Sequence, residues 1–333
     1  MPGAAVRRPR RGPVIALDAL AVAGGKTAYA LLVILGVATF AFALGHLSGD
    51  PVDAMAPPDA SADDREALRR RLGLDDSLVT QYGLFLGRAA RGDLGESWGQ
   101  RRPALDAALD RLPATLTLTG AAMGLAIAVG VPLGLAGGSR RRGGARVAGA
   151  VVSLLGQAVP AFWLGSVLIL AFAVERHWFP AAGLDGPWSL VLPAIALGLY
   201  PAAMIVRLLS VTLAEVRDED WVRTARGKGL RDRLIVSRHM APVIAAPMFA
   251  FVAVQLGFLV GGAVVVEAVF AYPGLGRLAL GAVQDRDIPL VQAVVIVVGS
   301  LTVVFSTVAD VLGQLVDPRA RGGRAMSAAG MAR

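Results

Sequence analysis

The stretch APVIAAPMFAFVAVQLGFLVGGAVVV, residues 241–266, contains no Asp, Glu, Lys or Arg. A helix needs about 20 consecutive apolar residues to cross the hydrocarbon core of a bilayer, so this stretch is long enough to span it. Five other segments share its length and its lack of charge: roughly 27–47, 114–137, 147–174, 187–206 and 289–309. The sequence therefore predicts an all-α membrane protein with six transmembrane helices.

Composition supports this class and excludes others. Of the 333 residues, 55% are hydrophobic and 17% charged, whereas a soluble domain carries about 25% charged residues. Cysteine is absent, which excludes disulfides and thiolate metal sites. The three histidines, at positions 46, 177 and 239, are too scattered in the sequence to predict a metal site. We attribute the net charge of +8 to basic ends of membrane helices, not to nucleic-acid binding.

The placement of basic residues predicts an orientation. Segment 27–47 is followed by no small-residue cleavage site, so it is interpreted as a signal anchor preceded by a basic tail, residues 1–26. With the N-terminus inside, the inner segments hold 21 Lys and Arg and the outer segments 12, nine of them in the long loop 48–113. Because long loops cross membranes largely regardless of charge, both termini are expected to be cytoplasmic, including a C-terminal tail at 314–333.

The region 48–112 is expected to form a small helical layer on the extracytoplasmic face. A capping box predicts the start of one short helix, and an acidic residue is expected to cap a second helix with apolar residues at helical spacing. This layer is interpreted as a structural cap on the outer face. The alternative is that its rim contacts a delivery protein. The boundary residues are Ser61 and Asp64 for the box, Gly73 for its helix end, Asp75 or Asp76 for the second cap and Gly92 for the second end.

Four prolines lie within the predicted membrane helices: Pro160, Pro193, Pro201 and Pro247. Proline removes an intrahelical hydrogen bond and kinks a helix. Small residues recur as well, as in the run Gly130 to Gly138. Small residues allow helices to approach closely, so hinge motion and plain close packing both remain open at these positions.

No nucleotide-binding motif is present. Gly25-Lys26-Thr27 resembles the end of a phosphate-binding loop, but Leu20 stands where that loop needs a glycine. Gly227-Lys228-Gly229 is followed by Leu230 where a hydroxyl is required. We predict no catalytic, cofactor or metal residues, and hence no enzyme in this chain alone.

The predicted spans also contain no ionisable residue away from their ends. Arg207, Glu267 and Asp310 are expected near an interface, at segment ends. A proton- or sodium-coupled carrier uses acidic groups deep in the bundle, so their absence argues against that class. A transport pathway here would be lined by weakly polar side chains: Gln157, Ser166, Gln255, Thr302 and Ser306.

The cytoplasmic loop of about residues 215–239 is the most informative charged segment. Its composition favours a short helix that Gly229 ends, followed by an amphipathic run into the next span. Two roles are open: an anchor on the lipid surface, or a docking element for a cytoplasmic partner.

Within this loop, Asp220-Trp-Val-Arg-Thr-Ala-Arg-Gly-Lys-Gly-Leu230 resembles the coupling loop of ABC-importer permeases of the dipeptide/oligopeptide/nickel family. The resemblance implies that this helix docks on an ATPase subunit. It assigns Asp220 as the acidic lead, Ala225 to a small contact face and Gly229 to the turn, with Lys228 and Arg238 in the same loop. Further stretches resemble the family in order between about 27 and 320: 49–53, 91–95, 111–115, 160–165, 262–267, 273–277 and 317–319.

One departure follows the Arg238-His239 pair. Pro242 and Val243 stand where the family usually has a basic and an amide residue. The fifth helix is therefore expected to begin abruptly, without one polar contact to the partner.

The resemblance implies a type-I ABC importer transmembrane fold with its core at 113–313, in the bacterial cytoplasmic membrane. It implies a heterodimer with a second, homologous permease, two cytoplasmic ATPase subunits and an extracytoplasmic solute-binding protein, all surrounded by lipid. Peptides are the expected cargo, with nickel chelates or another small solute as the alternative. Two other classes of function remain as alternatives: a secondary carrier and a membrane receptor.

Overall fold

The computed structural model describes residues 12–47, 52, 59, 61–71, 74–138 and 143–316. Over these residues the chain consists of helices joined by loops, with one isolated bridge between Glu96 and Pro103. The expectations for Gly73, for residues 49–51 and for 317–333 lie outside the described residues.

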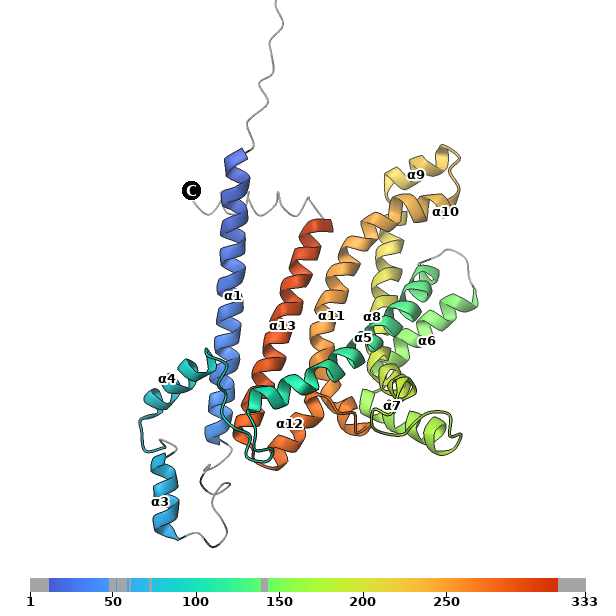
Figure 1. The fold of residues 1–333 in the computed structure, drawn as a ribbon. Coiled ribbons are helices and arrows are strands. Elements are labelled where there is room, and N and C mark those ends of the chain that lie inside the picture. The colour runs from blue at the N-terminus through green and yellow to red at the C-terminus, as the bar shows by residue number, and fades with distance from the viewer. Residues whose placement is uncertain are drawn as a thin grey trace, which may run out of the picture.

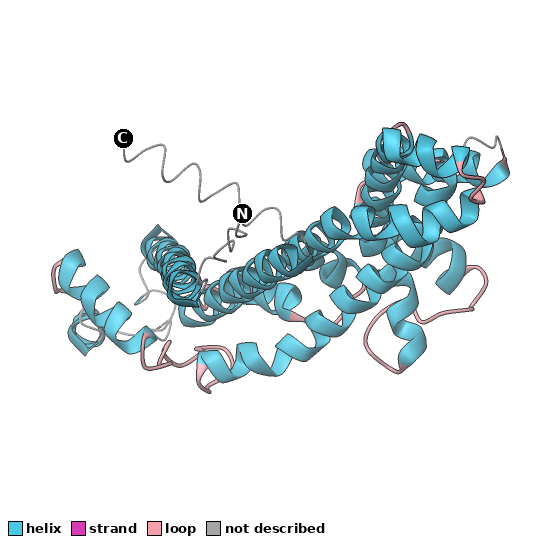
Figure 2. Cartoon of the chain, turned by 90° about the horizontal axis from the view of Figure 1, so that it is seen from above, coloured by secondary structure: helices cyan, strands magenta, loops and turns pink. Residues whose placement is uncertain are grey.

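The helices that carry the fold run along one general direction, with α5 crossing them obliquely (Figure 1). Seen from above, they form an elongated arrangement instead of a closed ring (Figure 2). The elements are α1 (Gly12–Leu47), α3 (Ala62–Arg71), α4 (Leu78–Ala89), α5 (Ala104–Gly137), α6 (Gly144–Ala158), α7 (Ala161–Leu168) with η1 (Ile169–Val174), η2 (Pro187–Leu190), α8 (Val191–Arg217), α9 (Asp220–Gly227), α10 (Asp232–Leu234), η3 (Ile235–Met240), α11 (Ala241–Val269), α12 (Leu275–Gln284) and α13 (Ile288–Val316).

Five helices of the described chain are long and apolar enough to cross a membrane, and a bent pair makes a sixth span if counted as one. The bent pair is the predicted third span, 147–174. It breaks at Val159 and Pro160, and α6 and the helix that follows meet at 109°. Proline cannot donate the next helical hydrogen bond and pushes the preceding residue out of the helical region, so the kink expected at Pro160 is a full break.

Several helices extend beyond their predicted ends, three of them by ten residues or more. Helix α1 already begins at Gly12, α5 begins at Ala104 and α8 continues to Arg217. Hydropathy marks only the part of a helix that suits the bilayer, and α5 continues past that part even through Pro113. The start of α1 and the end of α13 lie at the same end of the molecule as α9, and α12 lies at the other (Figure 1). We refer to these as the α9 end and the α12 end.

The largest helix contact joins α5 and α8. A Cβ atom added at Gly130, Gly134 or Gly138 would lie 2.7 Å from Ile205, Leu209 or Leu213, respectively. These residues are spaced four apart on both helices, so one glycine row of α5 receives one row of large side chains of α8. Close packing therefore explains these glycines, one of the two interpretations that the sequence left open.

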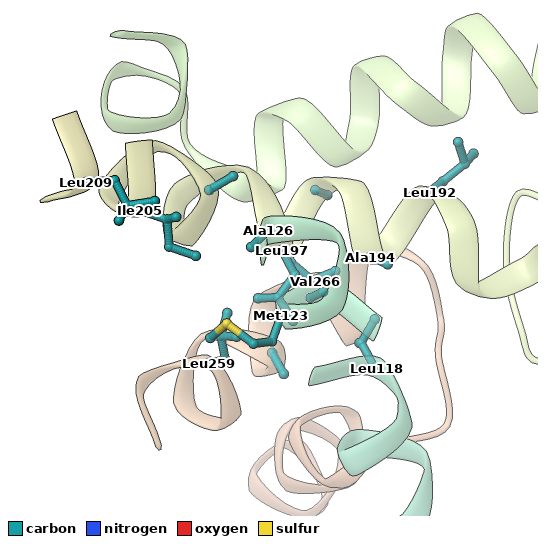
Figure 3. Packing of buried hydrophobic residues seen from close by; sticks show 14 of the residues in the cluster. Leu118, Met123, Ala126, Leu192, Ala194, Leu197, Ile205, Leu209, Leu259 and Val266 are labelled. Atoms are coloured by element: carbon teal, nitrogen blue, oxygen red, sulfur yellow. The ribbon is translucent and has the colours of Figure 1, made fainter. Parts of the chain in front are cut away.

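The core extends from this pair to α11. Leu118, Met123 and Ala126 of α5 pack with a row of α8 residues and with Leu259 and Val266 of α11 (Figure 3). Small residues in the α8 row, such as Ala194, bring the three backbones close together. This core leaves α8 as the most enclosed span, with 67% of its apolar window buried.

The expected helical layer at 48–112 contains α3 and α4. The predicted capping box is present: the Asp64 backbone N–H donates to Ser61 Oγ at 3.2 Å, and the Ser61 N–H donates to the Asp64 carboxylate at 3.2 Å. The second cap was predicted wrongly. Ser77, not Asp75 or Asp76, accepts from the Thr80 N–H, because α4 begins one residue after it.

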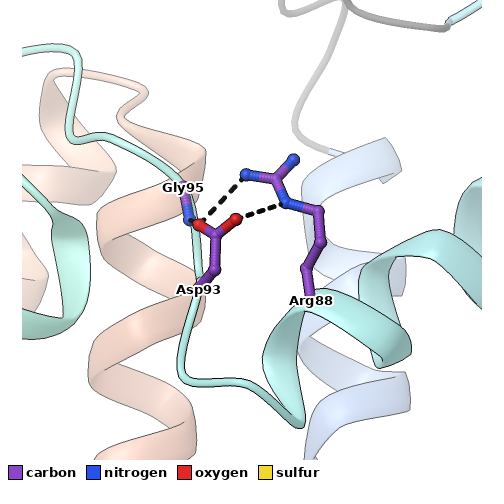
Figure 4. A network of polar contacts seen from close by, with 3 residues as sticks. All are labelled: Arg88, Asp93 and Gly95. Atoms are coloured by element: carbon purple, nitrogen blue, oxygen red, sulfur yellow. Dashed lines mark hydrogen bonds and ion pairs between the residues drawn. The ribbon is translucent and has the colours of Figure 1, made fainter.

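A hydrogen-bonded ion pair fixes the end of α4 against the following loop. Arg88 Nε donates to the Asp93 carboxylate at 2.9 Å, and the Gly95 N–H donates to the same group at 3.0 Å (Figure 4). The bond from Arg88, followed by that from Gly95, lowers the pKa of Asp93 below its ordinary value. With α1 and the start of α13, this loop borders a cavity of about 680 Å³.

Asp287 joins the next part of this loop to α13. One carboxylate oxygen accepts from Ser97 Oγ at 2.5 Å and from the Gly99 N–H at 3.1 Å, and the other accepts from the Leu290 N–H at 3.2 Å. The side chain is 2% exposed. Asp287 is thus both the N-cap of α13 and the anchor of a segment 188 residues away in sequence.

We expect Asp287→Ala to lower the free energy of unfolding by about 2 kcal/mol, since it leaves buried donors without an acceptor. The measurement is denaturant unfolding of the purified protein. Asp285→Ala is the matched control, because Asp285 is an exposed acidic residue two positions earlier. Equal stability of the two variants would contradict the anchoring role.

Candidate functional site: helix α9 and its supports

Helix α9 is a short helix that projects at one end of the fold and is held by an apolar residue. Val222 is fully buried and belongs to the same core cluster as Leu213 of α8 and Ile235 of η3. Most other side chains of α9 are exposed or half-buried, including Trp221 at 39%. With Val222 buried and most other side chains accessible, α9 presents a defined surface for a partner.

The end of α9 is a two-bond turn centred on Gly229. The Leu230 N–H donates to the Ala225 carbonyl at 3.2 Å, and the Gly229 N–H donates to the Arg226 carbonyl at 2.9 Å. This pair of bonds is the Schellman motif, which requires a left-handed residue at the position after the C-cap. Gly229 has φ = +80°, and a Cβ atom there would meet nothing within 4 Å. The glycine is required for its backbone conformation and not for space.

The charges around α9 are arranged as exposed pairs. Arg223 lies 3.6 Å from Asp220 one turn earlier, and Arg226 Nε donates to Asp232 Oδ1 at 3.0 Å across the turn. Exposed ion pairs of this kind contribute little to stability, typically below about 1 kcal/mol. Their effect is to give the surface an alternating pattern of charge, which favours recognition of a complementary partner.

Helix α9 follows the end of α8, which is hydrogen-bonded to the end of α5. Arg217, the last residue of α8, donates through Nη1 to the Gly138 carbonyl at the end of α5. Two turns earlier, Ser210 Oγ donates to the Gly134 carbonyl at 3.2 Å. The bond from Arg217 supplies a donor to the carbonyl of the α5 C-cap residue, and the bond from Ser210 adds a second donor to a carbonyl that already accepts from the Gly138 N–H at 3.1 Å. The chain leading into α9 is therefore attached to two packed helices.

The structure places the five predicted loop residues in one region, but they differ in exposure. Asp220, Lys228, Gly229 and Arg238 are exposed. Ala225, which the resemblance placed in a contact face, is half-buried and packs inward against the core cluster. The loop passes through η3 directly into α11, so the fifth helix has no gap before Pro242.

Sequence reasoning missed a second polar centre, at the α12 end. Glu267 lies near the end of α11, as expected, but the sequence did not indicate that its side chain is fully buried. Its carboxylate accepts from Thr115 Oγ1 at 2.7 Å and from the N–H groups of Gly276 at 2.7 Å and Arg277 at 3.2 Å. Thr115 Oγ1 in turn accepts from the Leu275 N–H at 2.8 Å.

These bonds satisfy the first three N–H groups of α12, whose own N-cap, Gly274, has no side chain to do so. A carboxylate at a helix N-terminus also interacts favourably with the helix dipole. The signal was in the sequence: a Glu at 267 followed by a Gly-Leu-Gly turn at 274–276. Glu267 thus joins α5, α11 and α12 at one point.

The arrangement of spans is that of a known transporter class. An inward-facing structure of the MetNI methionine ABC transporter matches with a TM-score of 0.50 at 20% identity, covering 63% of this chain and 96% of that one. The likeness concerns the fold, which is the type-I ABC importer transmembrane fold.

Sequence comparison gives the family. The family model for the inner membrane component of binding-protein-dependent transport systems matches residues 130–322. The glutathione transport system permease protein GsiC of Escherichia coli O6:H1 is 36% identical over 290 residues, 87% of this chain and 94% of that protein. A Brucella abortus protein provisionally named a peptide transport system permease is 36% identical over 305 residues, covering 89% and 97% of the two chains.

The chain therefore belongs to the family of binding-protein-dependent transport system inner membrane components. It is a multi-pass permease of the cytoplasmic membrane and a subunit of an ABC importer.

Proposed function

We propose that this chain is one of two homologous permease subunits of an ATP-driven importer, and that the importer carries di- or oligopeptides. Support for the cargo comes from the relatives, since glutathione is a tripeptide and a second relative is named for peptides. Nickel chelates or another small solute are the second candidate within the same class. A secondary carrier has no support from these relatives.

The observation that carries the proposed mechanism is the geometry of α9. It is exposed, charged and held by Val222 on helices that cross the membrane. In the proposed complex, α9 docks on one of two ATPase subunits, and the α9 end faces the cytoplasm. The excess of Lys and Arg in the segments at this end supports that orientation.

In this mechanism, a solute-binding protein delivers the peptide at the α12 end. ATP binding closes the two ATPase subunits and draws the two α9 helices together. The locked ends of α5 and α8 then carry this motion to the spans and open the pathway outward. Hydrolysis returns the complex to its inward-open state. This chain supplies half of the pathway and one coupling helix.

The test is uptake of a labelled tripeptide into proteoliposomes. We expect uptake only when this chain is combined with the second permease, the ATPase subunits, the binding protein and ATP. Omission of any one component, or a non-hydrolysable ATP analogue, should abolish multiple-turnover uptake. Movement of the peptide by this chain alone, without ATPase subunits, would refute the proposal.

A further inference from the structure

A row of side chains on α8 is left open although the helix is otherwise enclosed. Tyr200 and Val211 are each 51% exposed, Arg207 is exposed and Met204 is half-buried. Their spacing of three and four residues places them on one face. The opposite faces of α8 pack against α5, α6, α7 and α11. This open row, residues 200, 204, 207 and 211, contains one permanent charge.

Arg207 lies well inside α8. The helix ends at Arg217, ten residues later, which corresponds to about 15 Å at a rise of 1.5 Å per residue. Sequence reasoning placed Arg207 at the end of a span because hydropathy falls there. Among the described residues of the five spans, it is the exposed charged side chain farthest from an end of its span.

The guanidinium is directed away from the nearest helix end. Gly149 of α6 lies against Val206, and Gly156 lies against Leu199 and Ala203, so α6 and α8 run antiparallel. Residue 157 is therefore nearer the α12 end than Arg207 is. A Cα–Cβ bond tilts toward the N-terminus of its helix, which for α8 is the α12 end.

The guanidinium reaches an amide at this deeper level. Arg207 Nη1 donates to Gln157 Oε1 at 3.3 Å, and Gln157 Nε2 donates to the Ser153 carbonyl at 2.8 Å. No carboxylate of the described chain pairs with Arg207. A neutral amide holds the guanidinium in position but leaves its charge uncompensated.

A charge in this place disfavours lipid as the neighbour of the open row. An arginine at the centre of a membrane helix costs about 2.5–3.5 kcal/mol by insertion scales, and more by simulation. Arginines that face lipid reduce this cost by extending toward the nearer interface. Arg207 extends the other way, so its side chain requires water or an anion.

We propose that Arg207, oriented by Gln157, binds the carboxylate of the cargo as it passes through the pathway. This rests on the proposed function, in which the cargo is a peptide. The planar guanidinium binds a carboxylate through two parallel hydrogen bonds. The nearest members of the row, Met204 and Val211, offer only apolar contact, so the cargo meets one charged group in this row and is released easily.

The first experiment measures exposure to water, and the chain is well suited to it because it contains no cysteine. Single variants Arg207→Cys, Ala203→Cys and Leu32→Cys are made in the full importer, with partner subunits lacking reactive thiols. Ala203 is buried on α8, and Leu32 is 68% exposed on the apolar α1. A membrane-impermeant cationic thiosulfonate should label the Arg207→Cys variant at least about tenfold faster than the other two.

The second experiment tests the charge. Arg207→Cys should lose about 90% of tripeptide uptake. Attachment of an aminoethyl thiol adduct, which restores a positive charge, should recover several-fold more uptake than a neutral methyl adduct. Recovery by the neutral adduct to the same level would overturn the proposal, because it would show a role for bulk and not for charge.

The third experiment tests the cargo group. Arg207→Gln is compared with Arg207→Lys for a tripeptide with a free C-terminus and for its C-terminal amide. Because the binding protein is the same throughout, its preference cancels in the variant ratios. We expect at least a tenfold loss with Gln for the free acid, a smaller loss with Lys, and less than a threefold loss for the amide. Equal losses for both peptides, or absence of labelling at position 207, would refute carboxylate binding and indicate a structural contact.

Failure of the two proposals can be told apart. If the wild-type importer moves no peptide, the proposed function fails. If the wild type moves peptide and Arg207→Gln moves it equally well, only the role of Arg207 fails.

Discussion

The Gly229→Val variant is expected to insert into the membrane and assemble, but to hydrolyse ATP with uptake reduced about tenfold. The expectation follows from the backbone of this one residue. At φ = +80°, Gly229 is in the left-handed region, where an L-residue costs about 1–2 kcal/mol and a β-branched residue more. Since about 1.4 kcal/mol is a factor of ten in population, the turn after α9 would be largely lost.

Loss of this turn affects α9 in a specific way. The bonds from Leu230 to Ala225 and from Gly229 to Arg226 end the helix and direct the chain into η3. Without them the last turn of α9 frays, while Val222 still holds the first turn in the core. A docking helix with a disordered end can contact the ATPase but transmits its motion poorly.

Gly227→Ala is the matched control. Gly227 is two residues earlier, does not have a positive φ, and a Cβ atom added to it would meet nothing within 4 Å. Alanine there increases helix propensity by about 1 kcal/mol, so we expect normal coupling. The measurement is the ratio of peptide taken up to ATP hydrolysed in proteoliposomes. Normal coupling in Gly229→Val would contradict the docking role of α9.

Features with a local cause were predictable from the sequence. The capping box at Ser61 and Asp64 depends on residues three apart, and the turn at Gly229 depends on one residue's freedom. The spans were recognisable because uncharged apolar runs of about 20 residues indicate transmembrane helices. The break at Pro160 was predicted in place, but its 109° angle depends on how α6 and α7 pack against α8.

Features with a tertiary cause were not predictable in this way. Hydropathy ended the fourth span at 206 because Arg207 follows, yet the helix continues to Arg217 with its terminal guanidinium bound to α5. The resemblance assigned Ala225 to a small contact face, and nothing in the sequence indicated that it is half-buried and packs against the core cluster. The roles of Asp287 and Glu267 depend on partners that are up to 190 residues away in sequence.

Glu267→Ala is expected to have the largest effect on stability, a loss of about 3 kcal/mol or more in the free energy of unfolding. The change removes the acceptor of Thr115 and of two N–H groups at the start of α12. Each buried donor left without an acceptor costs about 1–3 kcal/mol. The side chain is fully buried, so solvent does not readily replace the lost bonds.

Glu267→Gln separates the hydrogen bonds from the charge. Its amide oxygen can accept from Gly276 and Arg277, while its amide nitrogen can donate to Thr115 Oγ1. We therefore expect a loss of about 1 kcal/mol, between the wild type and Glu267→Ala. Glu175→Ala, at an exposed glutamate, should change stability by less than about 0.5 kcal/mol.

The measurement is unfolding of the purified protein in mixed micelles, followed by loss of helical circular dichroism. The expected order of stability is wild type, Glu267→Gln, then Glu267→Ala, with Glu175→Ala equal to the wild type. Because Glu267 joins α5, α11 and α12, its loss should also expose the α12 end to protease before the α9 end. If the α9 end were cleaved first, the carboxylate would not be the point that holds these three helices together.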